Sequence, residues 1–307
     1  IIKYNIGWNK GIIKMKCEEN VDLKKLNTYR IGGTAKYLVK PGDIKALKNT
    51  IEELNEKNIK YYVLGGGSNV ILPDEDFDGA IIKLDKINTF LIKDSYVFAS
   101  SGLSLNEFIK KCLDEGYTNF SNLYGIPGSL GGAIVGNAGA NESEIFADLC
   151  AVLVYENGLI KLINKENIKY GYRYTEFKNS NVIVLGAIFK LVSGNVDNAW
   201  LMIKENLEKR KKTQPLEYPS AGSVFKNPEG LSAGKLIDEC GLKEKTKGGA
   251  KVSKKHANFI INENNATSYD IITLINEIKE EVKKQKHVEL ELEQVIVKWW
   301  NNEKKGS

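Results

Sequence analysis

The turn at residues 65–69 could bind a phosphate through its backbone. It reads Gly-Gly-Gly-Ser-Asn and follows a short apolar segment, residues 61–64, that is typical of a strand. Glycines there let backbone N–H groups approach an anion closely, because no Cβ blocks the way and positive φ becomes accessible. The G-K-[ST] of a P-loop is absent, and Pro73 with Asp74 disfavours the helix that a dinucleotide fingerprint would open. The residues alone leave two interpretations, a phosphate cradle of another kind or a tight turn.

A second glycine-rich stretch, residues 125–140, holds six glycines in sixteen residues, far above the usual share of about 7 per cent. Two such turns fit a long ligand with a pyrophosphate in its middle. Pro127 is expected in the first turn of a short helix, whose free N–H groups would face an anion. Close packing of small residues between two elements is the alternative.

Arg173 lies between aromatic residues in the run Tyr-Arg-Tyr-Thr-Glu-Phe at 172–177. Stacking could hold its guanidinium rigid as a planar donor to a carboxylate or an enolate. The alternative is an arginine that shields an aromatic surface, and in isolation this interpretation is the stronger one.

Ser223 lies among small residues in the segment 220–228, which makes its hydroxyl accessible, and Lys226 could polarise it. The segment is not the G-x-S-x-G of a hydrolase, and a serine that only forms a turn is the alternative.

The C-terminal segment 288–297 alternates apolar residues with Glu289, Glu291 and Glu293, which predicts a strand with three carboxylates on one face. Such a face is normally solvated. A carboxyl there is catalytic only where a cleft desolvates it.

Composition limits the chemistry further. Of 307 residues, 42% are hydrophobic and 27% charged, and the net charge of +5 suits anionic small molecules without requiring nucleic acid. Two histidines and four widely spaced cysteines make no metal-binding pattern, so no metal is expected, and the cysteines fit a reducing compartment. No apolar run is long enough to span a bilayer, so no membrane insertion is expected. Six lysines at 243–255 predict a solvated loop, with the steering of a diphosphate as the alternative.

The elements that must position these residues are mixed without the strand–helix rhythm of a doubly wound sheet, so the predicted fold class is α+β. One helix is predicted after Asp43, and another from Ser104, where Glu107 completes a capping box. A domain boundary is expected at 193–195. Strands are predicted at 29–39, 61–64, 80–84, 96–99, 150–155, 182–191 and 288–297, and further helices up to residue 212 and at 233–240 and 269–286.

Taken in order, seven motifs resemble the UDP-N-acetylenolpyruvoylglucosamine reductase family. They lie at 27–33, 64–69, 125–128, 137–140, 172–174, 220–228 and 290–293. The match spans about residues 22–297, and the combination is very specific although no single motif is. Residues 216–220 resemble the type that lacks an extra Tyr-bearing loop over the substrate.

This resemblance implies a two-part FAD-binding domain of the vanillyl-alcohol-oxidase-like (PCMH-type) fold at residues 1–194, with subdomains of about 1–84 and 85–194. It implies a C-terminal α+β substrate-binding domain at residues 195–301, whose last strand carries Glu293.

The implied activity is an NADPH-dependent, FAD-mediated reduction of the enolpyruvyl ether of UDP-N-acetylglucosamine to UDP-N-acetylmuramate, a step of peptidoglycan precursor synthesis. The enzyme is expected to be a cytoplasmic monomer with non-covalent FAD and no nucleic-acid partner. Arg173 and Glu293 would stabilise negative charge on the enolate, and Ser223 would give a proton to C2.

The remaining site residues follow from the same resemblance. Those implied to bind the cofactor are Gly65, Gly66, Gly67, Ser68, Asn69, Gly125, Ile126, Pro127, Gly128, Gly132, Ala133, Asn137, Ala140 and Arg210. Those implied to bind the substrate are Tyr172, Lys226, Asn227 and His256. The chain departs from the family's pattern at Gly136 and at residues 141–144.

Two other functions remain as alternatives. One is an oxidase of the same wider flavin fold, which the motifs of Ser223 and Glu293 argue against. The other is a non-catalytic nucleotide-sugar binding protein, which the joint presence of Arg173, Ser223 and Glu293 argues against.

Overall fold

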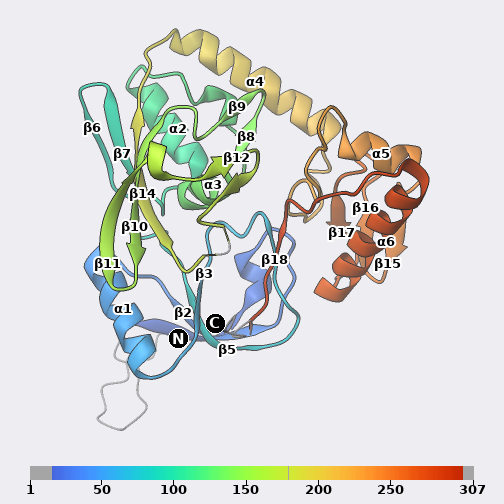
Figure 1. The fold of residues 1–307 in the computed structure, drawn as a ribbon, viewed down its shortest axis with the longest axis horizontal. Coiled ribbons are helices and arrows are strands. Elements are labelled where there is room, and N and C mark those ends of the chain that lie inside the picture. Colours follow the sequence, from blue (N-terminus) through green and yellow to red (C-terminus); the bar gives the residue numbers. More distant parts are fainter. Residues whose placement is uncertain (1–15, 179, 300–307) are drawn as a thin grey trace. The chain divides into compact units, whose positions relative to one another are not determined.

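The computed structural model describes residues 16–178 and 180–299 (Figure 1). The chain forms two compact units, each assembled from separate stretches of sequence. Unit 1 gathers the described residues up to Glu19 with Tyr37–Gly66 and Asp78–Lys209; unit 2 gathers Asn20–Lys36, Gly67–Phe77 and the described residues from Arg210 onward. Residues 1–15 of the predicted FAD-binding domain and 300–301 of the predicted substrate domain lie outside the described residues.

Unit 1 contains a five-stranded antiparallel sheet of order β11-β10-β14-β7-β6. In the central strand, Ala187 pairs with Ala99 on one side and Val152 on the other, so register is set from both sides. The β10–β11 hairpin turns at Asn157 and Gly158, both with positive φ, as a two-residue hairpin turn requires. The strands are β6 (Phe90–Lys93), β7 (Tyr96–Ser100), β10 (Leu149–Glu156), β11 (Leu159–Asn164) and β14 (Ile183–Lys190).

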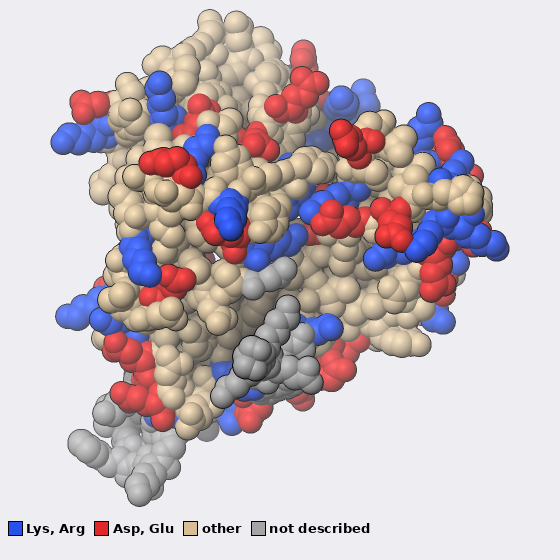
Figure 2. Space-filling view, viewed as in Figure 1, with Lys and Arg blue, Asp and Glu red and all other residues tan. Residues whose placement is uncertain are grey.

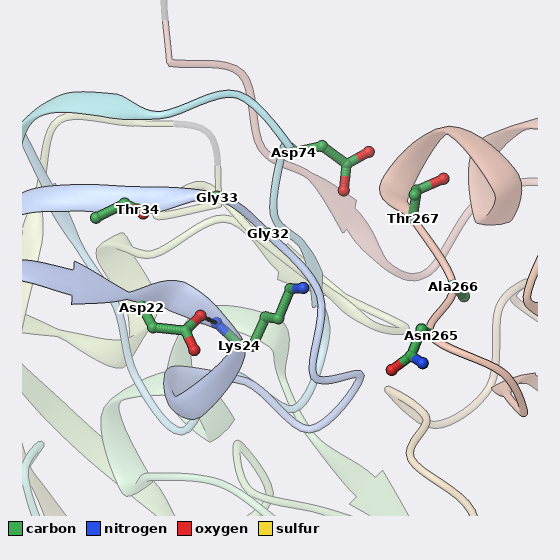
Figure 3. Close-up of a pocket in the computed structure, with 9 residues that line it drawn as sticks. All are labelled: Asp22, Lys24, Gly32, Gly33, Thr34, Asp74, Asn265, Ala266 and Thr267. Carbon is green, nitrogen blue, oxygen red and sulfur yellow. Dashed lines mark hydrogen bonds between the residues drawn. The ribbon is translucent and has the colours of Figure 1, made fainter.

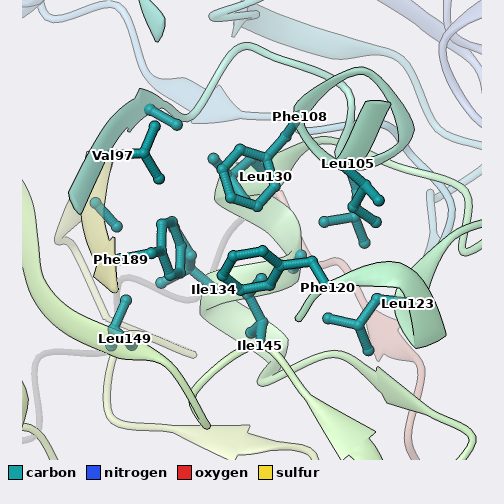
Figure 4. Packing of buried hydrophobic residues seen from close by; sticks show 14 of the residues in the cluster. Val97, Leu105, Phe108, Phe120, Leu123, Leu130, Ile134, Ile145, Leu149 and Phe189 are labelled. Atoms are coloured by element: carbon teal, nitrogen blue, oxygen red, sulfur yellow. The ribbon is translucent and has the colours of Figure 1, made fainter. Parts of the chain in front are cut away.

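Two helices, α2 (Leu105–Asp114) and α3 (Leu130–Gly136), share a hydrophobic core with this sheet. Phe108, Phe120 and Phe189 make mutual ring contacts with centroids 5.0–5.5 Å apart. Leu130 and Ile134 of α3 are fully buried in the same cluster (Figure 4). Aromatic packing therefore fixes the helix that lies within the second glycine-rich stretch.

The predicted start of α2 is confirmed, because the Ser104 hydroxyl accepts a hydrogen bond from the backbone N–H of Glu107 at 3.1 Å. The predicted place of Pro127 in the first turn of α3 is wrong. Ser129 caps α3 by accepting from the N–H of Gly132 at 3.2 Å, so the helix begins after the proline.

A second sheet has the order β1-β2-β5-β3, and β3 pairs with β5 in parallel. The helix predicted after Asp43 is confirmed as α1, and Asp43 caps it by accepting from the N–H of Ala46. The strands are β1 (Cys17–Asp22), β2 (Thr34–Val39), β3 (Tyr61–Val63) and β5 (Phe77–Ile82), and the helix is α1 (Ile44–Glu56).

In unit 2, a three-stranded antiparallel sheet of order β15-β16-β17 lies with helices α5 and α6. Thr267 and Asp270 form a capping box at the start of α6. Tyr29, Ile31 and Ile71 from the N-terminal stretches are buried in the core of this unit, and β2 accordingly begins five residues later than predicted. The elements are β4 (Val70–Ile71), β15 (Thr246–Lys247), β16 (Ala250–Val252), β17 (Ile260–Asn262), β18 (Val295–Ile296), α5 (Ala233–Glu239) and α6 (Ser268–Lys286).

The predicted C-terminal strand is much shorter in the structure. Only β18 is a regular strand, pairing in parallel with β4, and Glu293 lies two residues before it. The pairing partner changes along the segment: Leu292 bridges to Phe225, whereas Val295 pairs with Val70. This exchange of partners interrupts the ladder at Glu293.

Helix α4 (Val196–Thr213) carries the chain from unit 1 to unit 2. In the part of the chain that the structure describes, three short 3-10 helices span Leu23–Leu26, Ser121–Leu123 and Lys165–Asn167. The mixture of separate helices and mainly antiparallel strands confirms the predicted α+β class. Among the described helices, none combines the length and the apolar character that crossing a bilayer demands.

Candidate active site

The two glycine-rich turns meet in unit 1. A Cβ placed on Gly66 would lie 2.5 Å from the Cα of Gly128, and one placed on Gly65 would lie 2.8 Å from Ser129 Oγ. The backbones therefore touch where no side chain has room. This contact is the close packing of small residues that was the alternative interpretation, and it also puts both turns at one place, as a shared ligand would require.

The same turns present backbone donors. In the described part of the chain, the N–H groups of Gly65, Gly66 and Gly128 donate no hydrogen bond to protein. Backbone N–H groups are rarely left without an acceptor, and several that converge make a site for phosphate oxygens. The residues present therefore fit the pyrophosphate of a dinucleotide such as FAD.

Two residues that sequence reasoning missed support these turns. Lys83 donates from Nζ to the carbonyl of Gly65 at 2.7 Å, and burial lowers the pKa of this lysine. Asn106 accepts from the N–H of Gly125 at 2.7 Å. A lysine after a buried strand and an asparagine in a first helical turn are common features, so nothing in the sequence marked either one.

The second half of the first turn belongs to unit 2. Gly67 has a positive φ of 67°, and its carbonyl accepts from the N–H of Thr28 at 3.0 Å. Asn69 donates from its side chain to the carbonyl of Glu293 at 3.3 Å. In this unit the predicted cofactor residue Asn69 thus contacts the backbone of a predicted catalytic residue.

Arg173 lies in unit 1 on the hairpin between β12 (Tyr170–Gly171) and β13 (Tyr174–Thr175), with φ of 55°. Its guanidinium lies over the ring of Tyr172, 4.9 Å from the centroid, a contact that both interpretations of this segment allow. It also donates to the carbonyls of Gly139 and Asn137. These contacts orient a planar cation and limit the side-chain entropy lost on binding an anion.

Asn137 organises the support of Arg173. It is fully buried in the left-handed conformation that ends α3. Its side chain donates to Glu144 Oε2 at 3.0 Å and to the carbonyl of Gly171 at 2.9 Å. It thus joins the β8 (Gly139–Ala140) and β9 (Ser143–Glu144) hairpin to the hairpin of Arg173. The predicted residues Gly132, Ala133 and Ala140 lie on α3 and β8.

Ser223 and Glu293 lie on paired segments of unit 2. The N–H of Glu293 donates to the carbonyl of Val224 at 2.9 Å, and the N–H of Lys226 donates to the carbonyl of Glu291 at 2.9 Å. The structure therefore pairs the backbone segments that carry the two residues, with Glu293 bonded to Val224, the residue next to Ser223.

Lys226 is engaged by a carboxylate. Its Nζ forms an ion pair with Glu291 Oε1, and within the described residues it makes no hydrogen bond with Ser223. Asn227, also predicted to bind the substrate, accepts from the N–H of Ala233 at 3.0 Å, at the start of α5.

His256 is half-buried, and its ring packs on Phe259 with centroids 4.8 Å apart. Burial, the largest effect, lowers the pKa of His256, and Lys243 lowers it further. Its Nδ1 accepts from the N–H of Asn258 at 3.2 Å, which requires the neutral imidazole to carry its proton on Nε2. His256 is therefore a neutral donor at pH 7.

A pH dependence of stability follows from His256. Because its pKa is lower in the folded than in the unfolded chain, its contribution to stability is present above the unfolded value of about 6.5 and is lost as pH falls through the folded pKa. The free energy of unfolding should therefore fall less steeply between pH 7.5 and 5.5 in His256→Asn, whose amide oxygen can replace Nδ1 as acceptor. Urea titrations of both proteins measure this difference; parallel pH profiles would contradict it.

Arg210 donates from Nε to Gln214 Oε1 at 3.3 Å within unit 2, and burial lowers its pKa. The lysine-rich stretch is largely neutralised. Lys243, Lys245, Lys251 and Lys255 form ion pairs with Asp238, Glu277, Glu263 and Glu217. Figure 2 shows basic and acidic side chains interspersed on the visible face of the molecule.

A separate pocket with a volume of about 420 Å³ lies in unit 2 (Figure 3). Its two acids accept hydrogen bonds from neighbouring groups: Asp22 accepts from the N–H of Lys24, and Asp74 accepts from the N–H and the hydroxyl of Ser268. The described residues that line it include none that the sequence singled out for catalysis or binding. They are Asp22, Lys24, Gly32, Gly33, Thr34, Asp74, Asn265, Ala266 and Thr267.

Comparisons with known proteins give the context of this site. Residues 35–156 match the FAD binding domain family, and residues 214–297 match the C-terminal domain of UDP-N-acetylenolpyruvoylglucosamine reductase. The reductase of that name from Clostridium botulinum (strain Eklund 17B / Type B) is 42% identical over 274 residues, covering 89% of this chain and 90% of the relative. That of Carboxydothermus hydrogenoformans is 43% identical over 277 residues, covering 90% and 92%.

A solved structure agrees with the sequence relatives. The crystal structure of UDP-N-acetylenolpyruvylglucosamine reductase from Thermus caldophilus is similar with a TM-score of 0.79 and 32% identity, covering 92% of this chain and 100% of that one. Since curated relatives above 40% identity match about nine tenths of its length, the chain belongs to the UDP-N-acetylenolpyruvoylglucosamine reductase family.

Proposed function

We propose that this chain is an FAD-dependent oxidoreductase that uses NADPH to reduce the enolpyruvyl ether of UDP-N-acetylglucosamine to UDP-N-acetylmuramate, for peptidoglycan precursor synthesis. The observation that carries the proposal is the hydrogen bond in unit 2 from the N–H of Glu293 to the carbonyl of Val224, the residue that follows Ser223. A hydroxyl that can give a proton and a carboxyl that can stabilise a developing charge are what an enolate intermediate requires.

The residues that would hold FAD are the glycine turns of unit 1. The N–H groups of Gly65, Gly66 and Gly128, which have no acceptor among the described residues, suit its pyrophosphate, and Lys83 keeps the carbonyl of Gly65 in place. When bound, FAD supplies the hydride chemistry between NADPH and the substrate. The other predicted cofactor residues, Ser68, Asn69, Ile126, Pro127, Asn137 and Arg210 among them, belong to this proposal.

The roles of the chain's own groups in the reaction are three. Arg173 offers a guanidinium preoriented by Tyr172, which can stabilise negative charge on the substrate carboxylate as the enolate forms. Glu293 acts on the same charge as a protonated carboxyl. Ser223 donates its proton to C2, and Tyr172, Lys226, Asn227 and His256 bind the nucleotide sugar, with His256 as an uncharged donor.

We also propose that the enzyme is a cytoplasmic monomer. Its four cysteines are all free thiols, which fits a reducing compartment. The division into an FAD-binding domain at 1–194 and a substrate domain at 195–301 is part of the same proposal.

The test is anaerobic oxidation of NADPH by the purified yellow protein, with and without the enolpyruvyl ether of UDP-N-acetylglucosamine. Continuous oxidation only with that ether supports the proposal. UDP-N-acetylglucosamine, which lacks the enolpyruvyl group, is the matched control and should give none. A colourless protein, or a single flavin reduction that stalls with the ether present, would contradict it; rapid reoxidation by oxygen after reduction by substrate alone would favour an oxidase.

A further inference from the structure

A buried amide holds the two residues that precede Ser223. Gln294 is 2% exposed, and its Nε2 donates to the carbonyl of Ala221 at 3.1 Å and to that of Gly222 at 3.2 Å. Both N–H bonds of the amide are thereby used. A buried side-chain amide is costly unless its donors are paired, so this geometry is strongly preferred.

Tyr29 fixes the orientation of that amide. Its hydroxyl donates to Gln294 Oε1 at 3.1 Å, and its side chain is fully buried. Burial raises the pKa of Tyr29 well above its ordinary value, so the hydroxyl stays a donor. Carbonyl oxygens can only accept, which forces Nε2 toward residues 221 and 222 and Oε1 toward Tyr29.

A second buried amide holds the two residues after Ser223. Asn258 accepts from the N–H of Phe225 at 2.9 Å and donates to the carbonyl of Phe225 at 2.8 Å. The main-chain carbonyl of Asn258 accepts from the N–H of Val224 at 2.9 Å. Ser223 thus lies between two pairs of residues, 221–222 and 224–225, whose backbones are held by hydrogen bonds to Gln294 and Asn258.

We propose that Gln294, oriented by the hydroxyl of Tyr29, is a positioning residue that aims Ser223 for proton donation. The inference rests on the proposed function of Ser223. Proton transfer requires donor and acceptor within about 2.6–3.2 Å, and a misplacement of about 1 Å can cost 100-fold in rate. Because Gln294 follows Glu293 directly, and the N–H of Glu293 bonds to Val224, one short segment sets the place of both groups.

The experiment compares Gln294→Leu with the wild-type holoenzyme in anaerobic stopped flow. Reoxidation of the flavin by the enolpyruvyl substrate should slow roughly 10- to 100-fold, whereas flavin reduction by NADPH should stay within about twofold. The solvent deuterium isotope effect on reoxidation should rise, because a badly aimed proton transfer limits the rate more. A general loss of structure would slow both half-reactions together.

Tyr29→Phe is the milder variant, because it removes one hydroxyl and keeps the ring in the core. It should show the same pattern with a smaller effect, and the two substitutions combined should be non-additive. Ser268→Ala, which removes a hydrogen bond to Asp74 in the same unit, is the matched control and should leave both half-reactions unchanged.

Hydrogen exchange gives a readout independent of turnover. Amides of residues 223–226 should exchange faster in Gln294→Leu and in Tyr29→Phe than in the wild type or in Ser268→Ala. If Ser223→Ala turns over normally, the proposed role of Ser223 fails. If Ser223→Ala is inactive while Gln294→Leu and Tyr29→Phe keep the wild-type rate, isotope effect and exchange, the positioning inference alone is overturned.

Discussion

Ser223→Ala is expected to slow formation of UDP-N-acetylmuramate by about 100- to 10,000-fold, the usual contribution of a positioned general acid. The hydroxyl is needed only when the enolate takes its proton. Flavin reduction by NADPH precedes that step and should therefore proceed at the wild-type rate. Anaerobic stopped-flow absorbance separates the two half-reactions, and chromatography of the quenched mixture measures the product.

Ser220→Ala is the matched control, since it removes a hydroxyl from the same segment three residues away. Its rates should stay within about twofold of the wild type, as expected for a substitution without a role in proton transfer. Unchanged turnover in Ser223→Ala would show that another group or a water delivers the proton.

Gly66→Ala is expected to weaken FAD binding about 10- to 100-fold, the result of an overpacking cost of about 1–3 kcal/mol. The added methyl group would lie 2.5 Å from the Cα of Gly128, and a backbone atom cannot rotate out of its way. The two turns must then separate, which moves the N–H groups of Gly65 and Gly66 away from that of Gly128. The flavin-to-protein absorbance ratio after gel filtration and a fluorescence titration with FAD measure the loss.

Gly42→Ala is the control for this substitution, because a Cβ at Gly42 meets no atom within 4 Å. This variant should bind FAD as the wild type does. A Gly66→Ala protein that purifies fully yellow with unchanged affinity would show that the contact between the two turns does not build the cofactor site.

Local features of the fold could be predicted because their causes are local. Asp43 and Ser104 each start a helix through a side-chain bond to a backbone N–H three residues on, and both starts are confirmed. The same principle explains the error at Pro127. A proline is compatible with a first helical turn, but Ser129 two residues later offers the capping oxygen, and the helix begins there.

Features of the structure that depend on residues far away in the chain could not be predicted from the sequence. The C-terminal segment alternates like one long strand, yet its partner changes between Phe225 and Val70, which only the folded chain reveals. Lys83 and Asn106 were missed for the same reason, since each acts on a glycine turn that lies well away from it in sequence.

The candidate site shows a similar division. The small residues around Ser223 made its hydroxyl a candidate, and the charge alternation marked three carboxylates, of which the family resemblance singled out Glu293. Gln294 and Asn258 were not singled out, because a buried amide has no pattern of its own. Their roles became visible only through hydrogen bonds to the backbone of residues 221–225.

The discontinuity of unit 2 has a consequence for how the protein is made. Tyr29 and Gln294 are 265 residues apart, so at ribosomal rates their bond waits roughly 10–50 s after Tyr29 is synthesised. During that interval Tyr29, Ile31 and Ile71 lack the core that finally buries them. The nascent chain therefore carries unburied apolar surface at these three residues until residue 294 has been synthesised, a natural substrate for chaperones that act on emerging polypeptides. Conditions that slow elongation should lower the yield of this enzyme even where the stability of the finished protein is unchanged.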